Sequence, residues 1–325
     1  MALSTPPIPD PLAASAGSRI AVLVPCYNEE PTVAAVVAGY RAALPTAATY
    51  VYDNASSDRS VEAAAKAGAV VRTETRRGKG NVVRRMFADI EADIYVLVDG
   101  DATYDPAAAP AMVRELIEQR LDMVVGCRRE IIDDAYRAGH RFGNYILTAF
   151  LARLFGRAFT DILSGYRVFS RRFAKTFPSL SSGFEIETEI TVHALELRMP
   201  VSEVMTDYGA RREGSTSKLS TYRDGTRILW TMLTLFRQEK PFAFFAIVAG
   251  LLALAAVVLA VPLAITYSET GLVPRLPTAV LCTGLVILAF LSLTCGLILD
   301  TVTRGRLEMR RLAYLSYPTP DEPRR

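Results

Sequence analysis

The sequence contains little histidine and cysteine, and this excludes several kinds of site. Of its 325 residues, only 2 are histidine and 4 are cysteine. The cysteines, Cys26, Cys127, Cys282 and Cys295, form no C-x-x-C pair, so neither a disulfide framework nor a Cys/His zinc site is expected. We expect free cysteines, and we expect any bound metal to be held by carboxylate oxygens.

A strong charge of either sign is also absent. The 37 Lys and Arg residues against 34 Asp and Glu give a net charge of +3, so no nucleic-acid partner is expected. Neither G-x-x-x-x-G-K-[ST] nor G-x-G-x-x-G occurs, which removes support for an NTPase or a dinucleotide enzyme. Residues 1–18 lack the basic start and apolar core of a signal peptide. They are expected to form a disordered arm.

Long apolar runs are confined to the C-terminal part of the chain. Residues 242–265 and 278–299 carry no charged side chain. At 1.5 Å per residue, each run can cross a hydrocarbon core of about 30 Å as a helix. We predict two transmembrane helices, with a juxtamembrane amphipathic segment at 226–241 before them and a basic tail at 300–325 after them. Buried core helices are the alternative.

Basic residues flanking these runs predict their orientation. Arg237 and Lys240 precede the first run, and four arginines follow the second within residues 304–311, whereas the connecting loop offers only Arg275. Because basic residues favour the cytoplasmic side, both termini and the large N-terminal part are predicted to be cytoplasmic, with the chain anchored in a cell inner membrane.

In the N-terminal part, short apolar β-branched runs alternate with Ala-rich or amphipathic stretches. The runs are 19–25, 49–53, 69–73, 94–99 and 122–127, and the stretches between them are 32–44, 59–67, 80–92 and 106–119. This alternation predicts an α/β fold over residues 19–225, with a mostly parallel sheet and helices on both faces. Ligands bind such sheets beyond the carboxyl ends of the strands.

Polar residues follow three of these strands directly. The sequences are PCYNEE from Pro25, DNASSD from Asp53 and DGDA from Asp99. Asp99 and Asp101, separated by the flexible Gly100, suit Mg²⁺ or Mn²⁺ bound together with the phosphates of a substrate. Three acidic strand ends at one sheet edge would otherwise repel one another.

Two further observations bear on this edge. Lys79, in the sequence GKG at the start of a predicted helix, adds a cation and backbone N–H groups that can face an anion or a base. Asp58 and Asp105, in contrast, have a simpler interpretation as turn or N-cap residues.

Six motifs, in their order and spacing, resemble those of the family 2 glycosyltransferases of the polyprenyl-phosphate type. They are PCYNEE, DNASSD, RGKGNVVR, LVDGDATYD, DILSGYRVFSRR and REGSTSKL. Dolichyl-phosphate mannose synthase and the bacterial undecaprenyl-phosphate glucosyltransferases belong to that group. The resemblance covers residues 19–240, and the two apolar runs resemble the membrane anchor of bacterial and archaeal members. It implies a GT-A-like, Rossmann-like fold.

The resemblance also implies a role for each matching residue. Donor binding would fall to Pro25, Tyr27, Glu29, Asp53, Lys79, Asp99, Gly100 and Asp101, with Asp99 and Asp101 holding Mg²⁺ or Mn²⁺. Acceptor and diphosphate binding would fall to Arg128, Ser164, Arg211 and Lys218. Arg141, which lies outside the six motifs, is added to this set as an arginine in the region where the acceptor should arrive. Asp161 and Gly165 would lie at the reaction centre, with Asp161 and Asp101 as catalytic residues. Asp161 could act as a base or as an orienting group. Cys26 and Asn54 depart from the family pattern, which has Thr and Asp there.

The implied reaction is inverting transfer of one sugar, by a metal-dependent hexosyltransferase, from a UDP- or GDP-sugar to a polyprenyl phosphate. A phosphate with a second pKa of about 6 is already largely deprotonated at neutral pH, so the site needs cations more than a strong base. Arginines are abundant after the fifth strand: Arg128, Arg137, Arg141, Arg167, Arg211 and Arg212. Solvated surface charges are the alternative interpretation of each.

Two other functions stay open at this point. One is a processive polysaccharide synthase, although its Q-x-x-R-W helix is not visible. The other is a non-catalytic scaffold that binds a nucleotide sugar. Residues 185–197 are predicted to form a helix that directs Glu187 towards the site. Gly250, Gly284 and Gly296 permit helix packing in the membrane, including in a homo-oligomer.

Overall fold

The computed structural model describes residues 18–130, 149–150, 152–153, 159–179, 183, 185–209, 230 and 233–319. The chain divides into two compact units. The first comprises residues 1–225 together with 310–325, and the second comprises residues 226–309.

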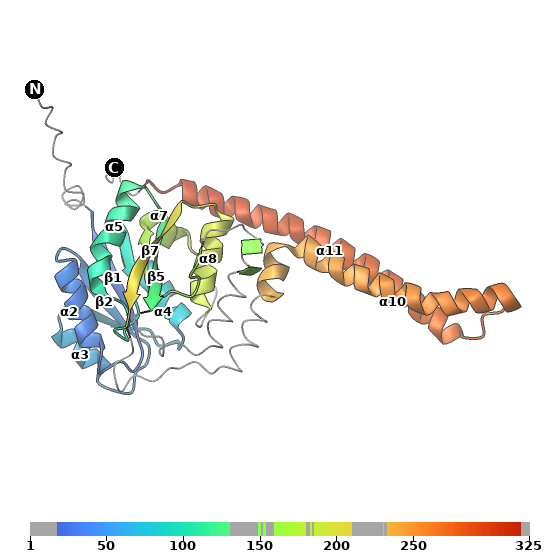
Figure 1. Cartoon of the computed structure of the whole chain (residues 1–325), viewed down its shortest axis with the longest axis horizontal. Coiled ribbons are helices and arrows are strands. Elements are labelled where there is room, and N and C mark those ends of the chain that lie inside the picture. Colours follow the sequence, from blue (N-terminus) through green and yellow to red (C-terminus); the bar gives the residue numbers. More distant parts are fainter. Residues whose placement is uncertain are drawn as a thin grey trace, which may run out of the picture. The chain divides into compact units, whose positions relative to one another are not determined.

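The described strands of the first unit form one seven-stranded sheet in the order β3-β2-β1-β4-β6-β5-β7 (Figure 1). They are β1 (Ile20–Cys26), β2 (Ala48–Asp53), β3 (Val70–Thr73), β4 (Ile94–Leu97), β5 (Met123–Glu130), β6 (Arg167–Ser170) and β7 (Val201–Tyr208). Only the pairs made by β6 are antiparallel. The prediction of a mostly parallel sheet is confirmed, and the five predicted runs coincide with β1 to β5.

Helices cover both faces of the sheet, as predicted. The first unit contains α2 (Val33–Ala43), α3 (Ser60–Lys66), α4 (Lys79–Asp89), the 3₁₀ turn η2 (Pro106–Ala108), α5 (Ala109–Glu118), α7 (Arg171–Thr176) and α8 (Ile186–Glu196). Figure 1 shows α2, α3 and α5 on one side of the sheet and α4, α7 and α8 on the other. The packing is aromatic on both sides: the rings of Tyr40 and Tyr166 meet edge to face at 5.9 Å, and those of Phe87 and Phe169 at 5.6 Å.

The antiparallel strand β6 determines where the loop before it lies. Arg167, the first residue of β6, pairs with Leu97 on one side and with Val125 on the other. The loop that precedes Arg167 therefore lies at the carboxyl ends of the parallel strands. The polar residues that follow β1, β2 and β4 reach the same edge of the sheet.

The second unit contains two long helices, α10 (Pro241–Thr270) and most of α11 (Leu276–Leu315). Both are long and apolar enough to cross a membrane. A side chain at Gly296 of α11 would meet Phe245 of α10 at 3.0 Å, so the glycine permits the two helices to approach closely. Gly250 and Gly284 face open space.

The last residues of α11 belong to the first unit and contact its surface. Arg310 pairs with Glu196 at 2.5 Å, and the Tyr314 hydroxyl donates a hydrogen bond to the Asp122 carboxylate at 2.7 Å. The guanidinium of Arg172 lies over the Tyr314 ring, 4.7 Å from its centroid. These contacts fix the C-terminal segment beside the first residues of β5.

Candidate active site

Gly100, in the loop after β4, lies against the end of β1 and the loop that follows it. A Cβ at Gly100 would lie 3.4 Å from the carbonyl oxygen of Pro25 and 3.6 Å from Cγ of Glu29. Thr32, which the motifs did not single out, ties the same loops together because its hydroxyl donates to the Gly100 carbonyl at 2.7 Å. The structure thus brings together three of the residues expected to bind the donor.

An aromatic surface lies close to these residues. The guanidinium of Arg77, in the loop before α4, lies over the ring of Tyr27 at 5.7 Å from its centroid. A ring backed by a cation in this way offers a flat face on which a nucleobase can stack.

The second strand end contains Asp53 and Asn54, both buried. The Asp53 carboxylate accepts the Ser56 N–H at 3.2 Å. The Asn54 amide donates to the carbonyls of Glu74 and Arg76 at 2.9 and 2.8 Å, and its oxygen accepts the Gly78 N–H at 2.7 Å. An aspartate could not donate the first two bonds, which explains why this chain has asparagine here.

Each of the three strand-end loops contains a residue with left-handed backbone. These are Asn28 (φ 53°), Ala55 (φ 60°) and Ala102 (φ 58°). Alanine is rarely found in this region, and residues held there often lie at functional sites. The geometry is therefore consistent with a binding edge formed by all three loops.

Lys79 lies between two carboxylates. Its ammonium is 2.5 Å from Oδ1 of Asp99 and 2.5 Å from Oε1 of Glu187. Burial by itself lowers the pKa of Lys79, but the two carboxylates outweigh burial and the pKa is raised. The lysine is therefore charged, and Glu187, on the first turn of α8, reaches the site as predicted.

The Asp99 carboxylate also contacts the loop before β6. A Cβ at Gly165 would lie 2.3 Å from Oδ2 of Asp99, so a larger residue there would require the Asp99 side chain to move. The Gly165 N–H donates to the Tyr104 hydroxyl at 2.9 Å. Burial raises the pKa of Tyr104, which keeps its hydroxyl neutral.

Asp101 accepts two hydrogen bonds from Thr103. Its Oδ1 accepts the Thr103 hydroxyl at 2.6 Å and the Thr103 N–H at 3.3 Å. Among the described residues no group of three or more His, Cys, Asp or Glu side chains could hold a metal. Mg²⁺ and Mn²⁺ often take only one or two carboxylates and complete their shell with phosphate and water. The partly exposed Asp99, with Asp101 two residues on, fits that requirement.

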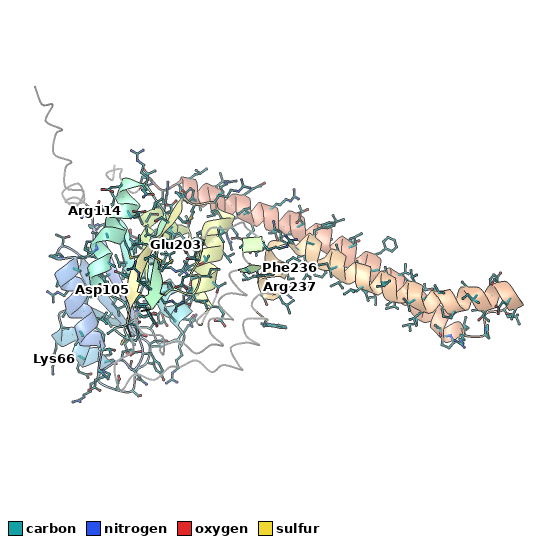
Figure 2. All side chains as sticks on the ribbon, in the orientation of Figure 1. Lys66, Asp105, Arg114, Glu203, Phe236 and Arg237 are labelled. Atoms are coloured by element: carbon teal, nitrogen blue, oxygen red, sulfur yellow. The ribbon has the colours of Figure 1, made fainter. Side chains whose placement is uncertain are left out.

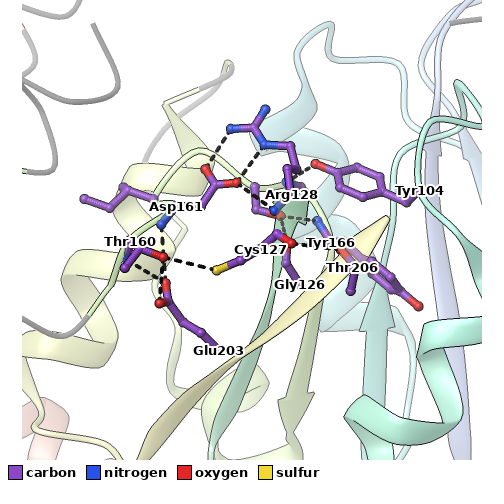
Figure 3. Close-up of polar contacts among 12 residues, drawn as sticks. Tyr104, Gly126, Cys127, Arg128, Thr160, Asp161, Tyr166, Glu203 and Thr206 are labelled. Carbon is purple, nitrogen blue, oxygen red and sulfur yellow. Dashed lines mark hydrogen bonds and ion pairs between the residues drawn. The ribbon is translucent and has the colours of Figure 1, made fainter. Parts of the chain in front are cut away.

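Arg128 and Asp161 form a bidentate ion pair on the other side of the site (Figure 3). Nε and Nη2 of Arg128 lie 2.7 Å from the two carboxylate oxygens of Asp161. The side chains are 12% and 11% exposed, so the pair is shielded from water. The guanidinium also lies over the Tyr208 ring, 5.6 Å from its centroid. A planar cation held in this way is suited to an anion such as phosphate.

Glu203 of β7 holds the beginning of the Asp161 loop and was not anticipated from the sequence (Figures 2 and 3). Its carboxylate accepts the Thr160 N–H at 2.6 Å, the Thr160 hydroxyl at 2.8 Å and the Asp161 N–H at 3.3 Å. Cys127 lies beside Thr160, and burial raises the pKa of its thiol to about 12. The thiol is neutral and serves as packing.

Arg167 holds the rest of the same loop, and this corrects one expectation. It was placed among the arginines that meet the acceptor, but it is fully buried. It donates to the carbonyls of Ile162 and Ser164 and to the Thr191 hydroxyl at 2.9 Å. It is a structural residue because the loop wraps around its guanidinium.

Ser164 is also fully buried, and its hydroxyl donates to the Gly126 carbonyl at 2.6 Å. In this structure Ser164 therefore closes the loop against β5. Its predicted contact with the acceptor stays a prediction.

Some predicted residues lie outside the described part of the chain. These are Arg141, Arg211 and Lys218, together with Arg137 and Arg212. Asp58 and Asp105 behave as the simpler interpretation predicts. Asp58 accepts the N–H groups of Ser60 and Glu30, both at 3.1 Å, and Asp105 accepts the Ala107 N–H at 2.9 Å.

The sequence profile of glycosyl transferase family 2 matches residues 21–177. The glycosyltransferase AglJ of Haloferax volcanii is 35% identical over 228 residues, covering 70% of this chain and 75% of AglJ. The chain belongs to glycosyltransferase family 2. A dolichyl-phosphate hexose transferase of the same organism is 24% identical over 68% of this chain and 95% of its own length.

Solved structures extend the comparison to the fold. Glucosyl-3-phosphoglycerate synthase from Mycobacterium tuberculosis, crystallised with Mn²⁺, UDP and glucosyl-3-phosphoglycerate, superposes with a TM-score of 0.57. It is 23% identical and covers 69% of this chain and 81% of its own. The same synthase has been crystallised with Mg²⁺ and UDP. The GT-A-like fold of this family 2 glycosyltransferase is thereby confirmed.

Proposed function

We propose that this enzyme transfers one sugar from a UDP- or GDP-sugar to a polyprenyl phosphate at the cytoplasmic face of a membrane. One observation carries the proposal: a single loop contacts both charged parts of the site. Gly165 lies against the Asp99 carboxylate, and Asp161, four residues earlier, holds Arg128. A carboxylate suited to a cation and an arginine suited to a phosphate are therefore held close together.

The chain's own residues account for the donor half of the reaction. Tyr27 and Asp53 would bind the base and ribose, and Asp99 and Asp101 would hold Mg²⁺ or Mn²⁺ on the diphosphate. The bound ion would supply positive charge to the leaving diphosphate as the glycosidic bond breaks. Lys79, which contacts Asp99 and Glu187, is a cation of the protein beside the same carboxylate.

On the acceptor side, Arg128 would bind and orient the attacking phosphate. Both oxygens of Asp161 are engaged by the guanidinium, and a phosphate nucleophile needs no strong base. Asp161 is therefore assigned an orienting role through Arg128. Direct displacement by the phosphate would invert the anomeric centre.

The lipid nature of the acceptor is supported by features outside the site. Helices α10 and α11 are long and apolar enough to cross a membrane. The contacts of Arg310 and Tyr314 with Glu196 and Asp122 support a topology in which the end of α11 and the sheet are on the same side of that membrane. Two spans whose outer ends are both cytoplasmic would put the sheet and the end of α11 on the same side. The name of the dolichyl-phosphate hexose transferase points to the same class of acceptor.

The test is a transfer assay with the purified full-length protein. Short-chain polyprenyl phosphate is offered with a panel of radiolabelled UDP- and GDP-sugars, with and without EDTA. We expect a lipid carrying one sugar, lost with EDTA and restored by Mn²⁺. A polymer would instead indicate a processive synthase, and tight donor binding without any product would indicate a scaffold. Transfer only to 3-phosphoglycerate would overturn the lipid acceptor.

A further inference from the structure

The ammonium of Lys79 contacts two carboxylates at the same distance. Asp99 comes from the end of β4 and Glu187 from the first turn of α8, and each places an oxygen 2.5 Å from the ammonium. The side chains of Lys79 and Glu187 are each 9% exposed, whereas that of Asp99 is 30% exposed. Of the two carboxylates, Asp99 is the one that solutes can reach.

The side chains of Lys79 and Glu187 are both largely buried, and buried charges without a partner are costly. The buried Arg167 also interacts electrostatically with Glu187. If Lys79 lost contact with Asp99, it would still be paired with Glu187. If Glu187 were absent, Lys79 would depend on Asp99 alone.

The neighbouring carboxylate is arranged differently. Asp101 accepts hydrogen bonds from the hydroxyl and the N–H of Thr103, two residues further along the same loop. Within the D-x-D sequence, Asp99 is thus the carboxylate that contacts Lys79.

We propose that Lys79 is an exchangeable counter-ion for Asp99. Without a divalent cation, Lys79 is shared between Asp99 and Glu187. When a divalent cation binds Asp99, Lys79 passes wholly to Glu187, which lies within reach without any rearrangement of the backbone. The inference rests on the proposed function in one respect, the assignment of Asp99 as a metal ligand.

This exchange predicts opposite effects for the two partners of Asp99. Removing Lys79 frees Asp99 and should strengthen binding of the divalent cation. Removing Glu187 leaves Lys79 bound to Asp99 alone and should weaken it. Because Glu187 acts through Lys79, its removal should matter less when Lys79 is already absent, which is a coupling measurable by a double-mutant cycle.

The experiment measures binding of Mn²⁺ alone to the full-length protein by electron paramagnetic resonance of the free ion. Lys79→Met should tighten the Kd and Glu187→Gln should weaken it, each by roughly fivefold or more, the lower range of couplings between sites. In the double variant the effect of Glu187→Gln should shrink. Thermal unfolding of each metal-free variant checks that it is folded.

Two variants control for net charge. Lys175→Met removes a cation of similar burial that pairs with Glu91 at 2.7 Å, and Glu189→Gln removes a carboxylate from the same turn of α8 as Glu187. Neither should change the Mn²⁺ Kd by more than about twofold, because neither lies between Asp99 and a partner.

Several results would overturn the exchange. They are weaker or unchanged Mn²⁺ binding in Lys79→Met, tighter or unchanged binding in Glu187→Gln, or equal effects of Glu187→Gln with and without Lys79. If Lys79→Met does not fold, the comparison of Glu187→Gln with Glu189→Gln tests the exchange. Mn²⁺ binding that is weaker in Glu187→Gln than in Glu189→Gln supports it, and equal or tighter binding overturns it. Asp99→Asn separates the two proposals: unchanged Mn²⁺ binding in that variant would refute the metal site itself, whatever the other variants show.

Discussion

The two sides of the site hold their carboxylates in different ways. On the side formed by the ends of β1, β2 and β4, here called the acidic side, Asp53 and Asp101 accept hydrogen bonds from N–H groups and a hydroxyl. On the side formed by β5, β7 and the loop before β6, here called the arginine side, Asp161 is paired with Arg128. Asp99, which shares Lys79 with Glu187, lies at the boundary between the two sides.

This difference determines which ligand charge each side can accept. Carboxylates held by hydrogen bonds present oriented oxygen ligands, so the acidic side favours a cation. A carboxylate already paired with a guanidinium fixes that guanidinium in place, so the arginine side favours an anion. Under the proposed function, a metal-bound diphosphate and an acceptor phosphate would occupy these two environments next to one another.

The largest expected effect is on the acidic side. Asp99→Asn and Asp101→Asn should each lower kcat by about 10²- to 10³-fold, because charge stabilisation of the leaving diphosphate is lost. Initial rates are measured over a range of Mn²⁺ concentrations. Asp105→Asn is the matched control, since Asp105 only caps η2 (Figure 2). A loss as large in the control would refute the assignment.

The next effect distinguishes the two sides. Arg128→Lys keeps the charge but loses the bidentate contact, and it should raise KM for the polyprenyl phosphate by about 10- to 100-fold. KM for the nucleotide sugar should stay within about twofold. Steady-state kinetics with each substrate varied in turn measures both. If the donor KM rose instead, Arg128 would belong to the acidic side.

A smaller effect is expected at Glu203, which positions Asp161 without touching a substrate. Glu203→Ala removes the acceptor of the Thr160 and Asp161 N–H groups and should lower kcat/KM for the acceptor by about tenfold. Glu203→Gln retains an oxygen acceptor and should restore most of that loss. Equal losses in both variants would mean that the charge of Glu203 matters rather than its hydrogen bonds.

His193, in the last turn of α8, should affect the stability of the protein but not substrate binding on either side of the site. Burial lowers the pKa of His193 to about 3. The folded protein therefore keeps it neutral, while the unfolded chain takes up a proton below pH 6.5. The stability due to this group is complete above that pH and is lost as the pH falls towards 3.

The expected loss between pH 7 and pH 5 is about 2 kcal/mol in the free energy of unfolding. Denaturant titrations measure it. Nδ1 of His193 has no hydrogen-bond partner among the described residues, so His193→Phe should remove this part of the pH dependence and leave both substrate KM values unchanged. A pH dependence identical to that of the unsubstituted protein would contradict the assignment.

The acidic side was largely predictable from the sequence. Each of its residues follows a short apolar run directly, and parallel strands bring such residues to one edge by topology alone. The asparagine at position 54 was noticed as a departure, but its reason is a contact with residues 74–78 that a linear pattern does not reveal.

The arginine side was predictable only in part. The motif DILSGYR identified Asp161, but the strand β6 that follows it was not predicted, and its antiparallel direction explains where the loop lies. Glu203 gave one weak signal, an acidic residue inside an otherwise strand-like run. For Arg167 the sequence offers no such signal, because nothing in a sequence distinguishes an arginine that binds loop carbonyls from one that faces a ligand.

The most direct measurement is the anomalous scattering of manganese in crystals of the protein grown with Mn²⁺ and UDP. If the acidic side holds the metal and the diphosphate, one peak should lie within coordination distance, about 2.0–2.3 Å, of carboxylate oxygens of Asp99 or Asp101. The Lys79 ammonium should then contact Glu187 and no longer Asp99. A peak beside Asp161, or UDP bound in the absence of any metal near Asp99 and Asp101, would contradict the account.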